Sequence, residues 1–368
     1  MEDRLVMKKV LFTAKNLEFG GVEKSLVRLL NRIDFDRYQV TLVLEEKRGP
    51  LLETLDPRVD VQEYRMSSAA FVPLRRAQNF LKRMFWTLRH RNRYDVSCSY
   101  CTYSVIGSRL AQAASFNSCL YVHNDYALIY PAEADYHAFF DQLRVNCFAH
   151  IVHVSEQSRA GFCKRLPNLS ERAVVINNLI DAEQIRMLAN EPCEFSRDPD
   201  ETVFIYLGRL SEEQKRITRL LEGMRHALEK RQDIRLLLVG DGPDRAMYEK
   251  MIQDLDLAAH VHLYGAQMNP YPFLAAADCL ILTSDFEGFP VVYYEALILH
   301  KNIITTVPTS DEWIDMVDYS DVIGKTAAAA ADAMVRFEPH SLPALHMEEA
   351  NQKRMRRLMG LVEQGGTR

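Results

Sequence analysis

Short apolar runs alternate with longer stretches of helical periodicity in this 368-residue chain, and both of its halves repeat the pattern. Strands are expected in the first half at about Lys9–Thr13, Val40–Leu44, Val96–Ser99, Leu120–Val122 and His150–His153, and in the second at about Thr202–Leu207, Ile234–Val239, Val261–Leu263, Cys279–Leu282 and Ile303–Thr305. Helices are expected at about Val22–Arg32, Arg75–His90, Ser104–Ala113, Glu133–Asn146, Ile217–Lys230, Arg245–Leu255, Pro270–Ala276 and Pro290–Leu299. Strand-helix alternation specifies parallel sheets with helices on both faces. The sequence therefore predicts an α/β chain of two doubly wound domains, which several classes of two-domain enzyme share.

Composition predicts where the domains end and in which cellular compartment the protein lies. The polar stretch 191–200 has two prolines and no periodicity, so we expect a hinge there between domains 1–190 and 201–345, followed by a C-terminal helix within 346–368. Seven cysteines, an odd number, and a lone Cys98-x-x-Cys101 favour packing residues over a zinc or redox site. The polar start and the short apolar run after Lys9 predict neither a signal peptide nor a membrane span, so a reduced cytoplasmic setting is expected.

Charge is divided unevenly, with a net +5 over residues 1–190 and −10 over residues 191–368. The stretch from Met66 to Tyr94 has no acidic residue, and the segment Leu74–Tyr94 is both basic and aromatic. Its apolar residues share one helical face, namely Leu74, Ala77, Leu81, Met84 and Leu88, with Phe85 and Trp86 beside it. Two interpretations stay open, contact with an anionic membrane and packing on the chain's own sheet. Nucleic acid is not expected, because no recognition motif accompanies the basic stretch.

Two glutamates flank a Gly-Phe-Pro turn late in the chain. Glu287 is expected in the loop after the buried strand Cys279–Leu282, and Glu295 inside a helix that begins at Pro290. Ligands of open α/β sheets bind outside the carboxyl ends of the strands, and the free N–H groups at a helix start attract phosphate. The pair therefore predicts ligand binding, although two such glutamates by themselves could also be solvated surface charges.

The second half also predicts an anion site. Gly208-Arg209-Leu210 follows a predicted strand, and Lys215 lies in the same loop. Arg209 and Lys215 could bind phosphate oxygens, with Arg216 able to replace Lys215. The nearby Gly240-Asp241-Gly242 begins a Gly-rich fingerprint, but Arg245 stands where the third glycine is needed, which argues against a dinucleotide site.

These motifs resemble the signature of retaining GT-B glycosyltransferases, most closely glycosyltransferase family 4, or group 1. The wording E-G-F-P-x-x-x-x-E-A-L from Glu287 carries the resemblance, together with the G-R-L at Gly208. It implies a GT-B fold of two Rossmann-like domains facing across a cleft, with the C-terminal helix returning to the first domain. It also implies a donor site in which Arg209 and Lys215 bind the diphosphate, Glu295 the ribose, and Glu287 with Gly288 and Phe289 the sugar.

The resemblance gives two first-half segments a place in the cleft. Gly20-Gly21-Val22-Glu23 matches the family's G-G-x-E run, and His123 follows a predicted strand, beside the expected donor sugar and reaction centre. The alternatives are a plain tight turn and a structural histidine.

The expected function is that of a metal-independent, retaining transferase of the hexosyl type without a cofactor, with a nucleotide sugar such as a UDP-sugar as donor. The acceptor is expected to be a lipid-linked or cell-envelope glycan, such as a lipopolysaccharide or capsule intermediate, and the enzyme cytoplasmic or peripheral on the inner membrane face. Two alternatives remain open. One is a non-catalytic nucleotide- or glycan-binding relative, and the other an NAD-dependent oxidoreductase.

Overall fold

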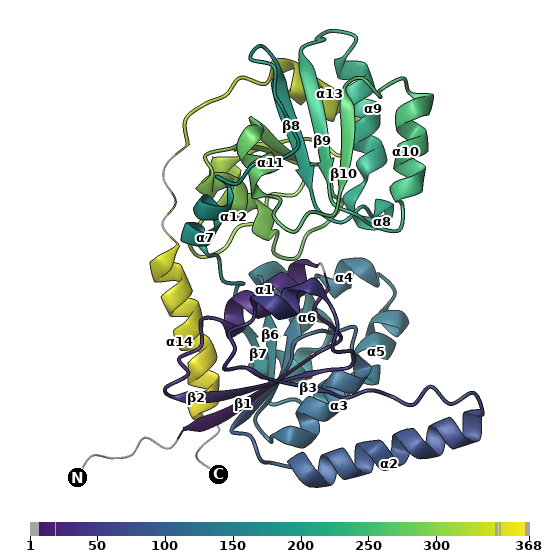
Figure 1. The fold of residues 1–368 in the computed structure, drawn as a ribbon, viewed down its shortest axis with the longest axis vertical. Helices are drawn as coiled ribbons and strands as arrows, with labels where there is room; N and C mark the ends of the chain where they lie inside the picture. The colour runs from purple at the N-terminus through teal and green to yellow at the C-terminus, as the bar shows by residue number, and fades with distance from the viewer. Residues whose placement is uncertain (1–6, 19, 343–344, 346, 365–368) are drawn as a thin grey trace. The chain divides into compact units, whose positions relative to one another are not determined.

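The chain forms two compact units, each with its own parallel sheet (Figure 1). The structure is a computed structural model that describes residues 7–18, 20–342, 345 and 347–364. Unit 1 takes the chain up to Leu179 and again from Gln352, whereas unit 2 comprises Ile180–Asn351.

Unit 1 is built on a sheet of seven described strands, and all neighbouring strands run parallel. The strands are β1 (Lys8–Ala14), β2 (Tyr38–Leu44), β3 (Asp60–Glu63), β4 (Val96–Ser99), β5 (Ser118–Val122), β6 (His150–His153) and β7 (Ala173–Val175). The helices are α1 (Gly21–Leu30), α2 (Val72–His90), α3 (Val105–Ala114), α4 (Tyr126–Ile129), α5 (Glu133–Gln142), α6 (Glu156–Arg165) and most of α14 (Glu348–Gln364). The order β3-β2-β1-β4-β5-β6-β7 reverses between β1 and β4, which is the doubly wound arrangement.

The apolar runs that predicted the strands of unit 1 are buried. β4 and β5 are buried along their whole length, because helices cover both faces of a parallel sheet. Helix α14 completes this core: its Leu358, Leu361 and Val362 belong to the same buried cluster as Phe12 of β1 and Leu42 of β2.

Helix α2 is attached to unit 1 through few side chains and has no buried residue. Its Trp86 ring lies edge-on to Tyr64, with 6.2 Å between ring centroids, and stacks on His90 at 4.5 Å. The face predicted from the apolar spacing instead remains exposed, at Leu74, Leu81, Met84 and Leu88. The structure thus contradicts the interpretation in which this face packs on its own sheet. None of the described helices has both the length and the hydropathy needed to cross a membrane.

Unit 2 is built on a second parallel sheet, of six described strands. The strands are β8 (Thr202–Leu207), β9 (Ile234–Val239), β10 (Val261–Gly265), β11 (Cys279–Leu282), β12 (Asn302–Thr305) and β13 (Asp321–Val322). The helices are α7 (Ala182–Leu188), α8 (Glu212–Lys215), α9 (Ile217–Ala227), α10 (Arg245–Asp254), α11 (Tyr271–Ala276), α12 (Val291–Ile298) and α13 (Ala327–Arg336). The order β10-β9-β8-β11-β12-β13 reverses between β8 and β11. The predicted pair of doubly wound parallel sheets is confirmed.

The structure moves the domain boundaries that composition predicted. The segment 191–200 lies inside unit 2, where Arg197 Nη1 lies 2.7 Å from Asp278 Oδ1 and Asn269 Nδ2 donates to Glu191 at 2.8 Å. Helix α7, predicted to lie in the first domain, also belongs to unit 2, because it packs against α11 and α12. The predicted hinge is therefore not the link between the units. In the predicted C-terminal segment, residues 346 and 365–368 lie outside the described residues.

Two glycines allow the backbone of the loop after β9 to lie directly against that of the loop after β8. Gly240 has a φ of +144°, and a Cβ at this position would overlap the carbonyl oxygen of Gly208. A Cβ at Gly242 would overlap the carbonyl oxygen of Leu210 in the same way. These close approaches fix the backbone that carries Arg209.

We expect Gly240→Ala to lower the free energy of unfolding by about 2–3 kcal/mol, because the methyl group meets backbone atoms at a φ that L residues avoid. Gly360→Ala is the control, since a Cβ there meets nothing within 4 Å and α14 is a regular helix. It should raise the free energy of unfolding by about 0.5–1 kcal/mol. Urea unfolding measures both values, and equal stability of the two variants would contradict the close approach.

Candidate functional site

The loops after β8 and β11, which are neighbouring strands at the reversal of the unit 2 sheet, are bonded to each other. The backbone N–H of Asp285 donates to the carbonyl of Gln214 at 2.8 Å, and the Gln214 side chain donates to the carbonyl of Phe286 at 3.1 Å. The Thr283 hydroxyl donates to the carbonyl of Arg216 at 3.0 Å. The two motifs singled out in the sequence therefore form a single structure.

Glu287 and Lys215 form a buried ion pair within this structure. Lys215 Nζ lies 2.7 Å from Glu287 Oε1 and 2.8 Å from Oε2, and Ser284 Oγ donates to Oε1 at 2.5 Å. The Glu287 side chain is 5% exposed and that of Lys215 17%. A carboxylate buried to this degree needs such partners, because desolvation penalises its charge. The structure thus brings together two residues that the sequence placed in different motifs.

Arg216 is held away from this pair. Its backbone has a φ of +50°, between helices α8 and α9, and its Nε donates to Asp285 Oδ2 at 2.5 Å. This hydrogen bond, with the Asp285 charge, raises the pKa of Arg216. Arg219 Nη2 donates to the other oxygen, Asp285 Oδ1, at 2.8 Å, while its Nη1 donates to the carbonyl of Thr283 at 2.6 Å. Arg216 is thus paired with Asp285, as Lys215 is with Glu287.

Arg209 is exposed, and no ion pair to it is found in the described part of the chain. Its carbonyl accepts from the Tyr206 hydroxyl at 2.7 Å, which fixes the backbone and leaves the guanidinium to solvent. A free cation on the same loop as the Lys215–Glu287 pair is suited to an anionic ligand.

Glu295 lies on α12 and is 8% exposed, with its Oε1 accepting from the Tyr271 hydroxyl of α11 at 2.9 Å. Helix α12 begins at Val291, one residue later than predicted, because Pro290 has an extended backbone and forms the N-cap. Phe289 is buried and stacks on Tyr294, with 5.0 Å between ring centroids, and Gly288 beside it is buried too.

His123 follows β5 in unit 1 and is also buried. Burial lowers its pKa to about 4, and a hydrogen bond to the carbonyl of Tyr100 offsets part of that effect. Nε2 has no hydrogen-bond partner among the described residues. The lowered pKa leaves the imidazole neutral at pH 7.

Gly20 and Gly21 lie at the start of α1, after β1. Gly20 is the N-cap, and a Cβ there would overlap the carboxylate of Glu23, which the Tyr103 hydroxyl also contacts. Gly21 has open space around its Cα, so no contact with the described residues requires a glycine there.

The sequence interpretation missed two charged residues of the site, Asp285 and Arg219. Asp285 opens the run that contains Glu287, but an aspartate in a loop carries no signal of its own. Arg219 lies one turn after Arg216 on α9, so the spacing could have placed both arginines on one side of the helix.

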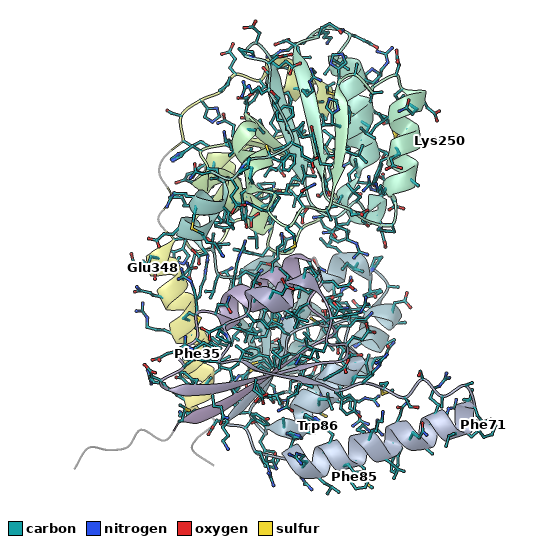
Figure 2. The ribbon with its side chains drawn as sticks, viewed as in Figure 1. Phe35, Phe71, Phe85, Trp86, Lys250 and Glu348 are labelled. Atoms are coloured by element: carbon teal, nitrogen blue, oxygen red, sulfur yellow. The ribbon has the colours of Figure 1, made fainter. Side chains whose placement is uncertain are left out.

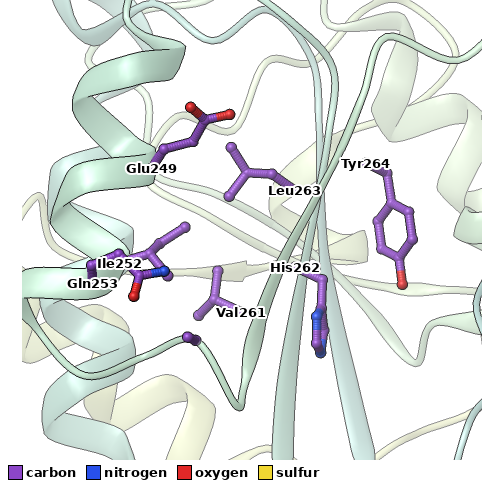
Figure 3. Close-up of a pocket in the computed structure, with 8 residues that line it drawn as sticks. Glu249, Ile252, Gln253, Val261, His262, Leu263 and Tyr264 are labelled. Carbon is purple, nitrogen blue, oxygen red and sulfur yellow. The ribbon is translucent and has the colours of Figure 1, made fainter.

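A shallow pocket of about 340 Å³ lies elsewhere in unit 2, between α10 and the edge strand β10 (Figure 3). It is lined by Glu249, Ile252, Gln253, Ala258, Val261, His262, Leu263 and Tyr264. None of the site residues described above lines it. Over the described ranges, no group of three or more His, Cys, Asp and Glu side chains is placed to hold a metal ion.

Comparison with known families gives matches over both units. Residues 19–184 match the family described as Glycosyltransferase Family 4, and residues 190–311 match the family described as Glycosyl transferases group 1.

Individual proteins give partial matches in sequence and a full match in fold. An uncharacterized glycosyltransferase of Methanocaldococcus jannaschii is 31% identical over 163 residues, which are 43% of this chain and 40% of that protein. The lipopolysaccharide core biosynthesis glycosyltransferase LpsD of Rhizobium meliloti is 32% identical over 113 residues, or 29% and 33%. The matches thus span well under half of these relatives. Anabaena Alr3699/HepE, solved with UDP and glucose, has a TM-score of 0.68 at 16% identity, covering 98% of each chain, which shows the GT-B fold.

The backbone at Arg216 allows a test of this loop. We expect Arg216→Gly to be more stable than Arg216→Ala by about 1 kcal/mol, because only glycine adopts the left-handed φ without a steric cost. Both variants lose the contact with Asp285, so this difference isolates the backbone. Urea unfolding measures it, and an alanine variant as stable as the glycine variant would contradict the left-handed conformation.

Proposed function

Since the chain belongs to the group 1 glycosyltransferases of the GT-B fold, we propose that it transfers a sugar from a nucleotide sugar to a cell-envelope glycan, with retention at the anomeric carbon. The observation that carries this proposal is the buried Lys215–Glu287 pair at the reversal of the unit 2 sheet, with the free Arg209 on the same loop.

The donor binds at the loops of unit 2. Its diphosphate contacts Arg209, Lys215 and the N–H groups at the start of α12, where the helix dipole favours negative charge. Its ribose hydroxyls contact Glu295, and its sugar hydroxyls contact Glu287 and the Gly288–Phe289 backbone. Lys215 thereby bridges the sugar-binding carboxylate and the phosphate. A UDP-sugar is the first candidate, because the structurally similar HepE was solved with UDP and glucose.

Both catalytic cations act on the leaving group. The bond from the anomeric carbon to the diphosphate oxygen breaks while the acceptor oxygen attacks from the same face, and the leaving phosphate takes the acceptor's proton. Negative charge grows on the diphosphate in the transition state, so Arg209 and Lys215 stabilise that state more than the ground state. The proposal requires no metal or other cofactor, and neither Glu287 nor Glu295 transfers a proton.

Unit 1 supplies the remaining contacts. His123 is neutral, since burial lowers its pKa to about 4, and its Nε2 accepts a hydrogen bond from a hydroxyl of the donor sugar beside the reaction centre. The backbone N–H groups of Gly20 and Gly21 approach the donor closely. The acceptor class follows from the relative LpsD, which acts in lipopolysaccharide core biosynthesis. A lipid-linked glycan made on the cytoplasmic face of the membrane fits this class.

Helix α2 supports a peripheral contact with an anionic membrane. Phe71, the N-cap of α2, and Phe85 are 68% and 65% exposed, and Figure 2 shows Phe71 at the end of the helix and Phe85 on its outer side. The basic residues of α2 are exposed as well, namely Arg75, Arg76, Lys82, Arg83 and Arg89. The helix has no acidic residue, so aromatic rings and cations together face an anionic lipid surface.

The donor site predicts a large kinetic effect. We expect Arg209→Ala to lower kcat/KM for transfer by about 10²- to 10³-fold, because the leaving diphosphate loses one charged partner. Arg225→Ala, an exposed residue of α9 paired with Glu229, should leave transfer unchanged. Transfer from radiolabelled UDP-sugars, with and without EDTA, measures both variants and the metal requirement. Wild-type activity in the Arg209 variant would contradict the placement of the diphosphate.

The membrane contact predicts loss of liposome binding on charge reversal of Arg75, Arg76, Lys82 and Arg83. Co-sedimentation with vesicles of mixed neutral and anionic phospholipid measures the binding. Its free energy should weaken by at least about 1 kcal/mol for each reversed residue. Four basic residues of unit 2 provide a matched control, Arg225, Lys230, Lys250 and Arg336. Equal binding of the two fourfold variants, or no binding by the wild type, would contradict the proposal.

A further inference from the structure

A series of buried polar contacts leads from helix α14 to Tyr100, beside His123. Arg354 of α14 donates from Nη1 to the carbonyl of Asn178 at 2.9 Å. Asn178 Oδ1 accepts from Ser25 Oγ of α1 at 2.7 Å, and Ser25 Oγ lies 2.8 Å from the Tyr100 hydroxyl. These four side chains are between 0% and 9% exposed. Buried hydrogen bonds hold side chains firmly, because water cannot replace a lost partner.

The hydrogen atoms in this series have one arrangement. Ser25 has a single hydroxyl hydrogen and gives it to the amide oxygen of Asn178, which can only accept. The Tyr100 hydroxyl must therefore donate to Ser25. Tyr100 stays protonated for this role, and burial raises the pKa of its hydroxyl. Each contact is thus a directed hydrogen bond.

Tyr100 in turn holds His123 in two ways. A hydrogen bond with its backbone offsets part of the fall in the His123 pKa, while His123 Nε2 has no partner among the described residues. Its ring packs against the imidazole, with 4.7 Å between centroids, and Tyr121 lies against both at 4.6 Å and 5.9 Å.

We propose that Tyr100 is a positioning residue for His123, and that Ser25, Asn178 and Arg354 hold Tyr100 in place. The role of His123 in transfer rests on the proposed function, whereas the positioning itself does not.

The series ends where the chain passes between the units, at Leu179–Ile180 and Asn351–Gln352. Asn351, one turn before Arg354 on α14, binds the backbone N–H of Ile180 at 3.0 Å and its carbonyl at 2.6 Å. Side chains of α14 thus bind the main chain on both sides of Leu179, where the chain first crosses from unit 1 to unit 2.

Kinetics separate positioning from a general loss of stability. Ser25→Ala and Tyr100→Phe should each lower kcat by about tenfold, equivalent to about 1.4 kcal/mol, and leave the donor KM unchanged, because the donor contacts in unit 2 are intact. Ser108→Ala is the control: Ser108 is equally buried in unit 1 but bonds to Ser99, outside this series. Its kcat should equal that of the wild type.

A double-mutant cycle tests whether Ser25 acts through His123. His123→Ala should lower kcat at least as much as Ser25→Ala, and the double variant should be no slower than His123→Ala alone. Losses that multiply in the double variant would overturn the proposal, as would an unchanged kcat for Ser25→Ala.

A spectroscopic measurement decides the same question without activity. Nitrogen-15 NMR of histidine-labelled protein should show His123, assigned by its absence in His123→Ala, as a neutral imidazole. Ser25→Ala should shift the His123 ring signals, whereas Ser108→Ala should not. Unmoved His123 signals in Ser25→Ala would overturn the positioning role. A wild type that transfers no sugar from any donor would instead overturn the proposed function alone.

Discussion

The burial of the Glu287 carboxylate is the constraint on which the rest of the site depends. A carboxylate on a side chain that is 5% exposed must be paired, and removing one partner of such a pair costs about 3–5 kcal/mol. Lys215 and Ser284 supply the partners, yet they reach Glu287 only because the loops after β8 and β11 are bonded to each other. Asp285 reinforces that connection by binding Arg216, between α8 and α9, and Arg219 of α9.

In unit 1 the cost of burying a charge is avoided, because the buried histidine is neutral. His123 is as buried as Glu295, but it avoids a charge, since burial keeps its pKa near 4. Its ring packs against that of Tyr100, whose hydroxyl is bonded to Ser25 of α1. The buried groups of unit 2 thus carry paired charges, whereas buried His123 of unit 1 is neutral.

The sequence predicted the helices and strands that a local apolar pattern marks. It missed features that depend on contacts between residues far apart in the chain. The apolar runs of β8, β9 and β11 gave these strands, whereas the edge strands β3 and β13 are polar and exposed, so no apolar pattern marked them. Helix α6 was missed because its sequence, EQSRAGFCKR, has little amphipathic character. The predicted hinge failed because Arg197 and Glu191 make ion-pair and hydrogen-bond contacts with residues about 80 positions away. Short motifs identified Glu287 and Lys215, but their direct contact follows from the pairing of β8 with β11.

The central claim is that the Lys215–Glu287 pair forms part of a nucleotide-sugar site. Thermal unfolding in the presence of nucleotide sugars, nucleoside diphosphates and NAD tests it most directly, because a ligand at 100 times its Kd stabilises the native state by about 2.7 kcal/mol. The account predicts that at least one nucleotide sugar raises the Tm of the wild type. It also predicts that this rise is lost in the variant with both Lys215→Met and Glu287→Gln, which removes the two charges together. A Tm raised by NAD alone, or raised equally by a nucleotide sugar in that double variant, would contradict it.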